Sequence, residues 1–195
     1  ESEATVNVQV EMACYTNQKT LKTELVITDA AGNEVARQTE DLVFNRKMRT
    51  CEYPLKEVKL TNPKLWDCEH PHLYTAKVTI YHENGEVADC VTERFGVRSL
   101  EFSPKFGMKL NGKKILLKGI ANHHSLGALG SAAYPRAIEK RIQMLKEFGV
   151  NHIRTSHNPY SEEFMDLRVE DGIPEVHDLY AKWHDLKEGG RAPWG

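Results

Sequence analysis

Hydrophobic and polar residues alternate along the first half of the chain. Residues 6–12 carry an apolar side chain at every second position, which is the pattern of a strand with one buried face. Further short strands are predicted at residues 21–28, 34–39, 56–60, 74–82 and 86–95. Asn84-Gly85 separates the last two and predicts a hairpin, because both residues tolerate positive φ. Short strands with turn sequences between them predict a β-sandwich of about 100 residues.

The pattern changes near residue 96, where strands and helices begin to alternate. Residues 106–120 predict a small hairpin that leads into a buried strand at residues 115–120. A helix is expected next, because Pro135 suits its first turn and Gly149 is placed to end it. The residues expected on its buried face are Ile138, Ile142, Leu145 and Phe148.

A second strand is predicted at residues 150–155, and Ser161 is suited to cap a second helix that ends at Gly172. A third strand is expected near residues 173–179, where polar residues interrupt the apolar run. Strand, helix, strand and helix in succession predict a parallel sheet. A closed barrel needs about 250 residues, so this part is expected to be an incomplete α/β domain. The predicted domains are residues 1–101 and residues 102–195.

The composition, with 40% hydrophobic and 28% charged residues, fits an ordinary globular protein. The formal net charge of −2 gives no reason to expect nucleic acid or an anionic membrane as a partner. No apolar run is long enough to cross a bilayer, and no signal peptide is visible. The chain lacks an initiator Met, so we expect a piece of a longer protein. The scattered cysteines, interpreted as buried or partly buried thiols, are Cys14, Cys51, Cys68 and Cys90.

Basic side chains follow two strands of the predicted parallel sheet. His123 and His124 come directly after the first strand, and Arg154 and His157 stand at the end of the second. Consecutive parallel strands end side by side, so we expect these groups to converge at the edge where α/β proteins bind ligands. Imidazole and guanidinium groups suit hydrogen bonding to hydroxyls and to a carboxylate.

Two other roles are open to the histidines. Each of them, taken alone, can be a loop or capping residue, but the set at two neighbouring strand ends favours a binding site. A metal site is disfavoured, because the adjacent His123 and His124 point apart on a regular backbone. No metal ligand is therefore predicted in this chain.

Four motifs occur in a fixed order: LWDCEHPHLY at residues 65–74, TERFGVRSLEF at 92–102, LNGKKILLKGIANHH at 110–124 and IRTSHNP at 153–159. In that order they resemble glycoside hydrolase family 2, the family of β-galactosidases, β-glucuronidases and β-mannosidases. The resemblance implies an immunoglobulin-like β-sandwich followed by the first βα units of a TIM (β/α)8 barrel. It also implies a retaining hydrolase of terminal β-linked sugars. The last motif favours the β-galactosidase branch, with β-glucuronidase and β-mannosidase as alternatives.

By the same resemblance, Arg154 would hydrogen-bond the nucleophilic carboxylate and keep it ionised, while His123 and His157 would contact sugar hydroxyls. The family commonly has Asn-Arg before the first of these histidines, whereas this chain has Ala121-Asn122. The loop's arginine is therefore missing. The family's two catalytic glutamates lie on later barrel strands, and the Asn-Glu pair that marks one of them is absent here. No catalytic residue is therefore predicted within this chain.

The resemblance also sets the expected partners. We expect a β-glycoside or an oligosaccharide as substrate, no cofactor, no nucleic acid and no membrane. The resemblance is also compatible with a homo-oligomer of the whole enzyme. Trp66 could stack on a sugar, but we interpret it as a core anchor. A different hypothesis is a non-catalytic carbohydrate-binding or scaffold module. The residues that follow Gly195 would separate the two, because only a hydrolase needs further βα units and an Asn-Glu pair.

Overall fold

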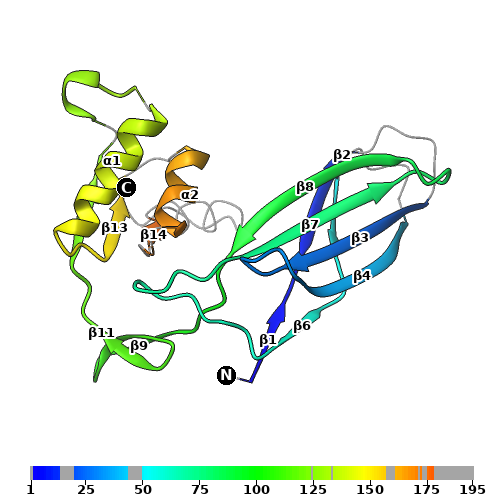
Figure 1. Ribbon diagram of the computed structural model, residues 1–195, viewed down its shortest axis with the longest axis horizontal. Helices are drawn as coiled ribbons and strands as arrows, with labels where there is room; N and C mark the ends of the chain where they lie inside the picture. Colours follow the sequence, from blue (N-terminus) through cyan, green and yellow to red (C-terminus); the bar gives the residue numbers. More distant parts are fainter. Residues whose placement is uncertain are drawn as a thin grey trace, which may run out of the picture. The chain divides into compact units, whose positions relative to one another are not determined.

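A computed structural model of the chain describes residues 2–13, 20–43, 50–123, 125–132, 134–156, 161–170, 172 and 175–177. The chain divides into two compact units, whose strands and helices are labelled in Figure 1. The first unit consists of Glu1–Leu65 and His72–Val97, and the second consists of Trp66–Pro71 and Arg98–Gly195. The short segment Trp66–Pro71 thus groups with the second unit, although both of its flanks belong to the first. The domain boundary after residue 101 stays a prediction.

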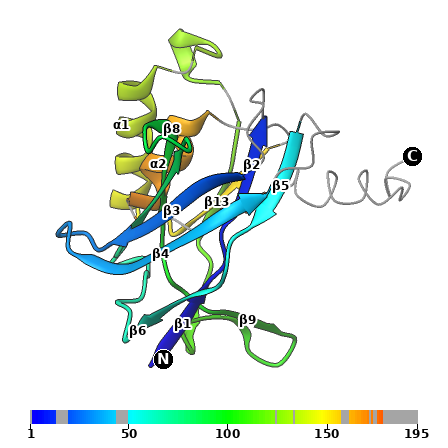
Figure 2. The ribbon, with the colours of Figure 1, turned by 90° about the vertical axis from the view of Figure 1, so that its right-hand side faces the viewer.

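Strands make up the described part of the first unit. They are β1 (Glu3–Val6), β2 (Gln9–Ala13), β3 (Thr20–Thr28), β4 (Glu34–Val43), β5 (Thr50–Pro54), β6 (Val58–Thr61), β7 (Tyr74–Tyr81) and β8 (Val87–Phe95). One antiparallel sheet has the order β4-β3-β7-β8, while β1 pairs with β6 and β2 with β5 (Figure 2). The predicted hairpin is confirmed as β7 and β8. The single strand predicted at residues 6–12 is wrong, because β1 and β2 take different partners.

The core of the first unit is formed by the apolar side chains that point to one face of its strands. Alternate residues of β3 are buried, as side chains that point to opposite faces of a strand require. The buried apolar residues are Leu21, Leu25, Ile27, Leu42, Leu55, Val58, Leu60, Tyr74, Ala76 and Ile80. The apolar residues of the 6–12 segment pack against this cluster while remaining partly exposed. The packed faces form the β-sandwich that the alternation predicts.

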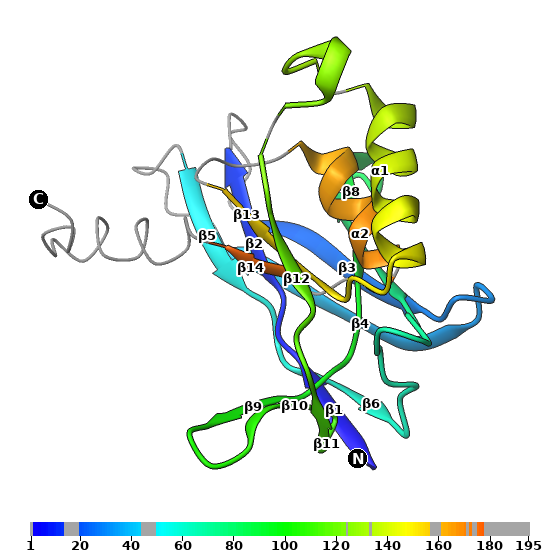
Figure 3. The ribbon, with the colours of Figure 1, turned by 90° about the vertical axis from the view of Figure 1, so that its left-hand side faces the viewer.

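The described part of the second unit contains two small sheets and two α-helices. Its elements are β9 (Leu100–Ser103), β10 (Gly107–Leu110), β11 (Lys113–Ile115), β12 (Gly119–Asn122), a short 3-10 helix (Gly127–Leu129), α1 (Pro135–Glu147), β13 (His152–Thr155), α2 (Glu162–Glu170) and β14 (Glu175–His177). Strands β9 to β11 form an antiparallel sheet, and β12, β13 and β14 form a parallel one. Both helices lie on the same side of the parallel sheet (Figure 3).

Helix α1 begins at Pro135 and is followed by Gly149 at φ +77°, as the sequence predicts. Its residues Ile138 and Ile142 are buried with Ile153 and Phe164 in one apolar cluster. The Phe164 N–H also reaches the Ser161 hydroxyl, at 3.4 Å, so the predicted cap of α2 is confirmed.

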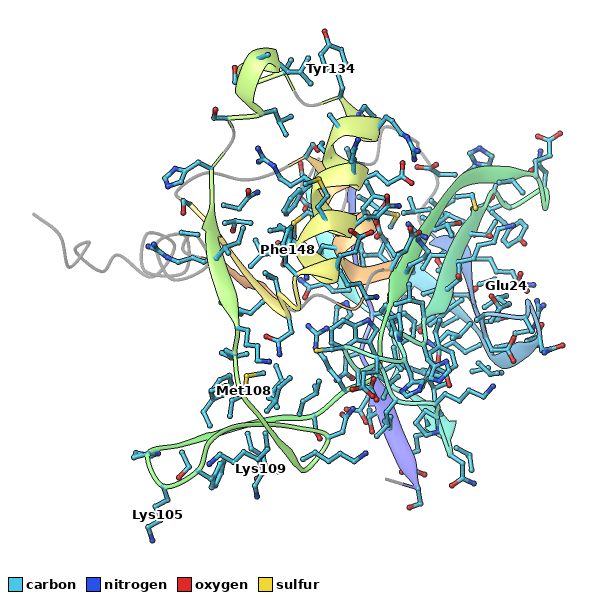
Figure 4. All side chains as sticks on the ribbon, turned by 60° about the vertical axis from the view of Figure 1, so that its left-hand side comes forward. Glu24, Lys105, Met108, Lys109, Tyr134 and Phe148 are labelled. Atoms are coloured by element: carbon cyan, nitrogen blue, oxygen red, sulfur yellow. The ribbon has the colours of Figure 1, made fainter. Side chains whose placement is uncertain are left out.

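The expectation that Phe148 is buried is wrong, because its side chain is 82% exposed. Phe148, labelled in Figure 4, follows the last residue of α1. Since the helix has ended, position 148 no longer continues the buried face that the helical spacing extrapolates.

The strand predicted at residues 115–120 is interrupted. β11 ends at Ile115 and β12 begins at Gly119, and Leu116 between them is 74% exposed. The side chain of Asn151 binds the backbone between β11 and β12. The Asn151 side-chain oxygen accepts a hydrogen bond from the Lys118 N–H at 2.7 Å, and the Asn151 side-chain amide donates one to Leu116 O at 2.9 Å. The side chain of a distant residue thus takes the place of a strand partner.

Trp66 is a core anchor, as interpreted from the sequence, but it anchors the second unit. Its side chain has 0% exposure. The Arg98 guanidinium lies 4.7 Å from the centre of its ring, a distance at which cation–π attraction acts. Full burial leaves no open ring face on which a sugar could stack.

Asn111 connects three segments of the second unit. Its side-chain amide donates to Trp66 O at 3.0 Å, and its side-chain oxygen accepts from the Ser99 N–H at 2.9 Å. Its own backbone N–H donates to Ser99 O at 2.9 Å. Asn111 has a positive φ of 51°, a conformation that asparagine tolerates better than most residues.

The cysteines divide between two environments. Cys68 is partly buried, as expected, and its burial raises the pKa of the thiol, which disfavours the reactive thiolate. Cys90 is exposed, so the expectation of burial is wrong there. It lies on β8, whose residues are exposed along almost the whole strand. Cys14 and the side chain of Cys51 lie outside the described part of the chain.

We expect Asn111→Ala to lower the free energy of unfolding by about 2–4 kcal/mol, because it removes two side-chain hydrogen bonds and leaves alanine at positive φ. Asn111→Gly is the matched control. Glycine adopts this φ without strain, so its loss should be about half as large. Urea unfolding of both variants measures the difference, and an Asn111→Ala variant as stable as the parent would contradict the assignment.

Candidate functional site

β12 and β13 are parallel neighbours, so their carboxyl ends meet at one edge of the sheet. Their register runs from Gly119 opposite His152 to Asn122 opposite Thr155. One step further, the Ser156 N–H donates to Asn122 O at 2.9 Å. The parallel pairing predicted from the sequence is confirmed, and the expected third strand is present as β14, parallel to β13.

Arg154 lies on the face of the sheet that is turned away from the helices. Its neighbours Ile153 and Thr155 are 0% and 2% exposed, and Ile153 packs against both helices. Successive side chains of a strand point to opposite faces, so the exposed Arg154 points to the other side. In a barrel with its helices outside, that is the inner side.

His123 is the first residue after β12 and is exposed. Ala121, two residues before it, is the register partner of Arg154. The structure therefore brings His123 and Arg154 to neighbouring strand ends. His124 and His157 lie outside the described residues, so the meeting of all the basic groups and their contact with a ligand stay predictions.

The loop after β12 is held by Arg141, a residue of α1 that the sequence analysis missed. Its Nη1 donates to Asn122 Oδ1 at 3.0 Å and to His123 O at 3.1 Å, and its Nη2 donates to Ser125 O. Asn122 itself is 5% exposed. The sequence contains only an indirect sign of this contact: the arginine that the family commonly has directly before His123 is absent, and Asn122 stands in its place.

Close packing fixes the opposite, amino-terminal end of the strand pair. A Cβ atom added at Gly119 would clash with Nδ1 of His152 and lie 3.1 Å from the His152 backbone oxygen. A side chain at position 119 would therefore push β12 away from β13. The Asn151 N–H also donates to Lys118 O at 3.0 Å, so both strands enter the sheet in fixed register.

Glu175 lies away from the candidate edge of the sheet. It is the first residue of β14 and pairs with Ile153, whereas His177 pairs with Thr155 nearer the carboxyl ends. Its register position therefore does not favour it as a catalytic acid at that edge. Within the described ranges, no cluster of three or more His, Cys, Asp and Glu side chains is arranged to hold a metal ion. No helix in the described part of the chain is both long and apolar enough to span a bilayer.

Comparison with protein families matches both halves of the chain. Residues 1–98 match the family model of Glycosyl hydrolases family 2. Residues 105–189 match the model of the TIM barrel domain of the same family. The parallel sheet with its two helices is thus the start of a barrel domain that follows the sandwich.

Curated relatives include enzymes of two specificities. The chain is 34% identical to a β-galactosidase of Bacteroides ovatus over 187 residues, which are 96% of this chain and 20% of that protein. It is 28% identical to a β-glucuronidase of Bacteroides fragilis, over 88% of this chain and 24% of that protein. The chain therefore spans about a quarter or less of the length of these relatives.

Solved structures show the same arrangement of elements. A glycosyl hydrolase family 2 member from Bacteroides cellulosilyticus matches 89% of this chain and 22% of its own, with a TM-score of 0.82 and 30% identity. A β-glucuronidase of Parabacteroides merdae matches 89% of this chain and 21% of its own, with a TM-score of 0.79 and 28% identity.

We expect Gly119→Ala to cost about 1–3 kcal/mol of stability, because the added methyl group overpacks the contact with His152. His152→Ala in the same chain removes the clashing ring, so the double variant should lose less than the sum of the two single variants. Urea unfolding of the four proteins in this cycle measures the coupling. Strictly additive losses would show that the ring does not limit the approach of β12 to β13.

Proposed function

This chain belongs to glycosyl hydrolase family 2, and from that premise we propose that the whole protein is a retaining glycosidase that cleaves terminal β-linked sugars. The observation that carries the proposal is the parallel pairing of β12 with β13. It brings the ends of the two strands that bear the candidate sugar-binding residues to one edge of the sheet. Ligands of such barrels bind at that edge.

The proposed mechanism divides the work between this chain and the rest of the barrel. Retaining glycosidases use two carboxyl groups about 5–5.5 Å apart, one as acid/base and one as nucleophile. We assign both to later strands outside this chain. Arg154 then donates hydrogen bonds to the nucleophile and keeps it ionised, because a nearby positive charge lowers the pKa of a carboxyl group. His123 and His157 hydrogen-bond the hydroxyls of the sugar.

Among the sugars, we propose a β-galactoside as the substrate. The support is the motif IRTSHNP at residues 153–159 and the 34% identity to a relative named β-galactosidase. Relatives named β-glucuronidase match over much of the same region. A β-glucuronide is therefore the first alternative, and a β-mannoside the second.

We expect the whole protein to hydrolyse a nitrophenyl β-galactoside faster than the matching β-glucuronide and β-mannoside. The product should keep the β configuration, which NMR of the first-formed sugar reports. The isolated 195-residue chain is the control and should be inactive, because it lacks the catalytic pair. Turnover by that chain would contradict the proposal, and a whole protein that binds sugars without cleaving them would favour a binding module.

We expect His157→Ala in the whole protein to lower kcat/KM by about 10-fold or more, because it removes a hydrogen bond that strengthens in the transition state. An unchanged kcat/KM would refute the role assigned to His157.

Arg154→Met should move the acidic limb of the kcat/KM profile to higher pH. Without the guanidinium the nucleophile has a higher pKa, so it stays ionised only at higher pH. Arg136→Met is the matched control, because Arg136 pairs with Glu139 on the surface of α1. A profile unchanged by Arg154→Met would remove this residue from the proposed mechanism.

A further inference from the structure

Arg141 is the residue through which α1 holds the loop that carries His123. Its guanidinium donates to one side-chain oxygen and two backbone oxygens, which belong to Asn122, His123 and Ser125. All three acceptors lie within four consecutive residues, at the end of β12 and in the loop that follows it. His123 and Ser125 lie beyond Asn122, the last residue of β12. The helix therefore supplies hydrogen bonds to backbone carbonyls that lie past the end of the strand.

The chemistry of the contact favours positioning over simple charge pairing. A guanidinium presents five N–H donors in one rigid plane, so three bonds to one loop restrict its path and not only its distance from the helix. The three acceptors are neutral oxygens. The contact includes the backbone of His123 itself, so the freedom of the His123 side chain is limited by where Arg141 holds its carbonyl.

The loop also departs from the family's usual sequence at this point. Ala121-Asn122 stands where an Asn-Arg pair is common, so no guanidinium comes from the loop itself. Asn122 is instead 5% exposed and accepts a hydrogen bond from Arg141. In this chain, the guanidinium that contacts the end of β12 comes from helix α1.

We propose that Arg141 is a positioning residue for sugar binding, which acts by holding Asn122, His123 and Ser125 so that His123 faces the substrate. This inference rests on the proposed function and deepens it. Arg141 makes no contact with the reacting atoms in this scheme. Its effect on the reaction passes through His123, and that separates it from a residue that only stabilises the fold.

A double-mutant cycle in the whole protein tests the proposal. Arg141→Met keeps the apolar stem and removes the hydrogen bonds, and it should lower kcat/KM for the cleaved nitrophenyl glycoside roughly 10- to 100-fold. In a chain that already carries His123→Ala, the same change should cost little more. Arg141→Lys should recover part of the loss, because it restores a charged donor without the planar fork.

Arg136→Met is the matched control for this cycle. Arg136 lies on the same helix and pairs within it, with Glu139 at 2.5 Å, and its side chain is 82% exposed. It should leave kcat/KM unchanged. Additive losses in the Arg141 and His123 cycle would overturn the proposal, because they would mean that Arg141 acts on the fold and not through His123.

Hydrogen exchange of the same whole proteins gives a readout that does not depend on activity. Arg141→Met should speed the exchange of the backbone amides of residues 123–126 at least about tenfold, and Arg136→Met should not. Unchanged exchange would overturn the proposal whatever the kinetics. If the parent protein cleaves no glycoside, both the proposed function and the sugar-binding role of Arg141 are contradicted. Faster amide exchange in Arg141→Met would in that case still show that Arg141 holds the loop.

Discussion

The parallel pairing of β12 with β13 is the constraint on which the second unit depends. Parallel strands cannot be joined by a tight turn, so the chain must leave the sheet, form α1 and return. Asn151 binds the chain where it enters the pair, and Ser156 extends the ladder where it leaves. At the entry, the absent side chain of Gly119 lets the two backbones approach. This register sets His123 and Arg154 at neighbouring strand ends.

The segment Trp66–Pro71 makes the packing of the second unit depend on a stretch of chain that lies within the sequence of the first unit. It stands in the chain between β6 and β7 of the sandwich, yet its buried tryptophan belongs to the second unit. The chain therefore passes between the units before and after this segment and again after Val97. A unit whose core includes a residue from within the other unit's sequence cannot complete its packing alone. The hydrogen bond from Asn111 to the Trp66 carbonyl strengthens this dependence.

The site region combines a rigid base with a loop that needs support. The strands β12 and β13 are regularly paired and the apolar cluster beside them is buried, whereas His123 and Ser125 lie beyond the end of β12. Arg141 donates hydrogen bonds to the carbonyls of both residues from the packed helix. Functional residues are commonly carried by loops on a rigid scaffold, and here a single guanidinium connects the loop to that scaffold. In the proposed function, this chain supplies part of the sugar-binding wall, and the carboxylates come from later strands of the barrel.

The sequence by itself determined the features that depend on neighbouring residues. Alternation predicted the sandwich strands, Pro135 and Gly149 predicted the ends of α1, and the order of four motifs indicated the family. Tertiary structure decided the rest: the interruption at Leu116, the exposure of Phe148, the unit to which Trp66 belongs, and the contact of Arg141 with the loop. The physical reason is that periodicity and turn preference are local, whereas these features depend on hydrogen bonds and packing between segments far apart in the chain. Spacing along a sequence carries no record of which distant backbone group a side chain will reach.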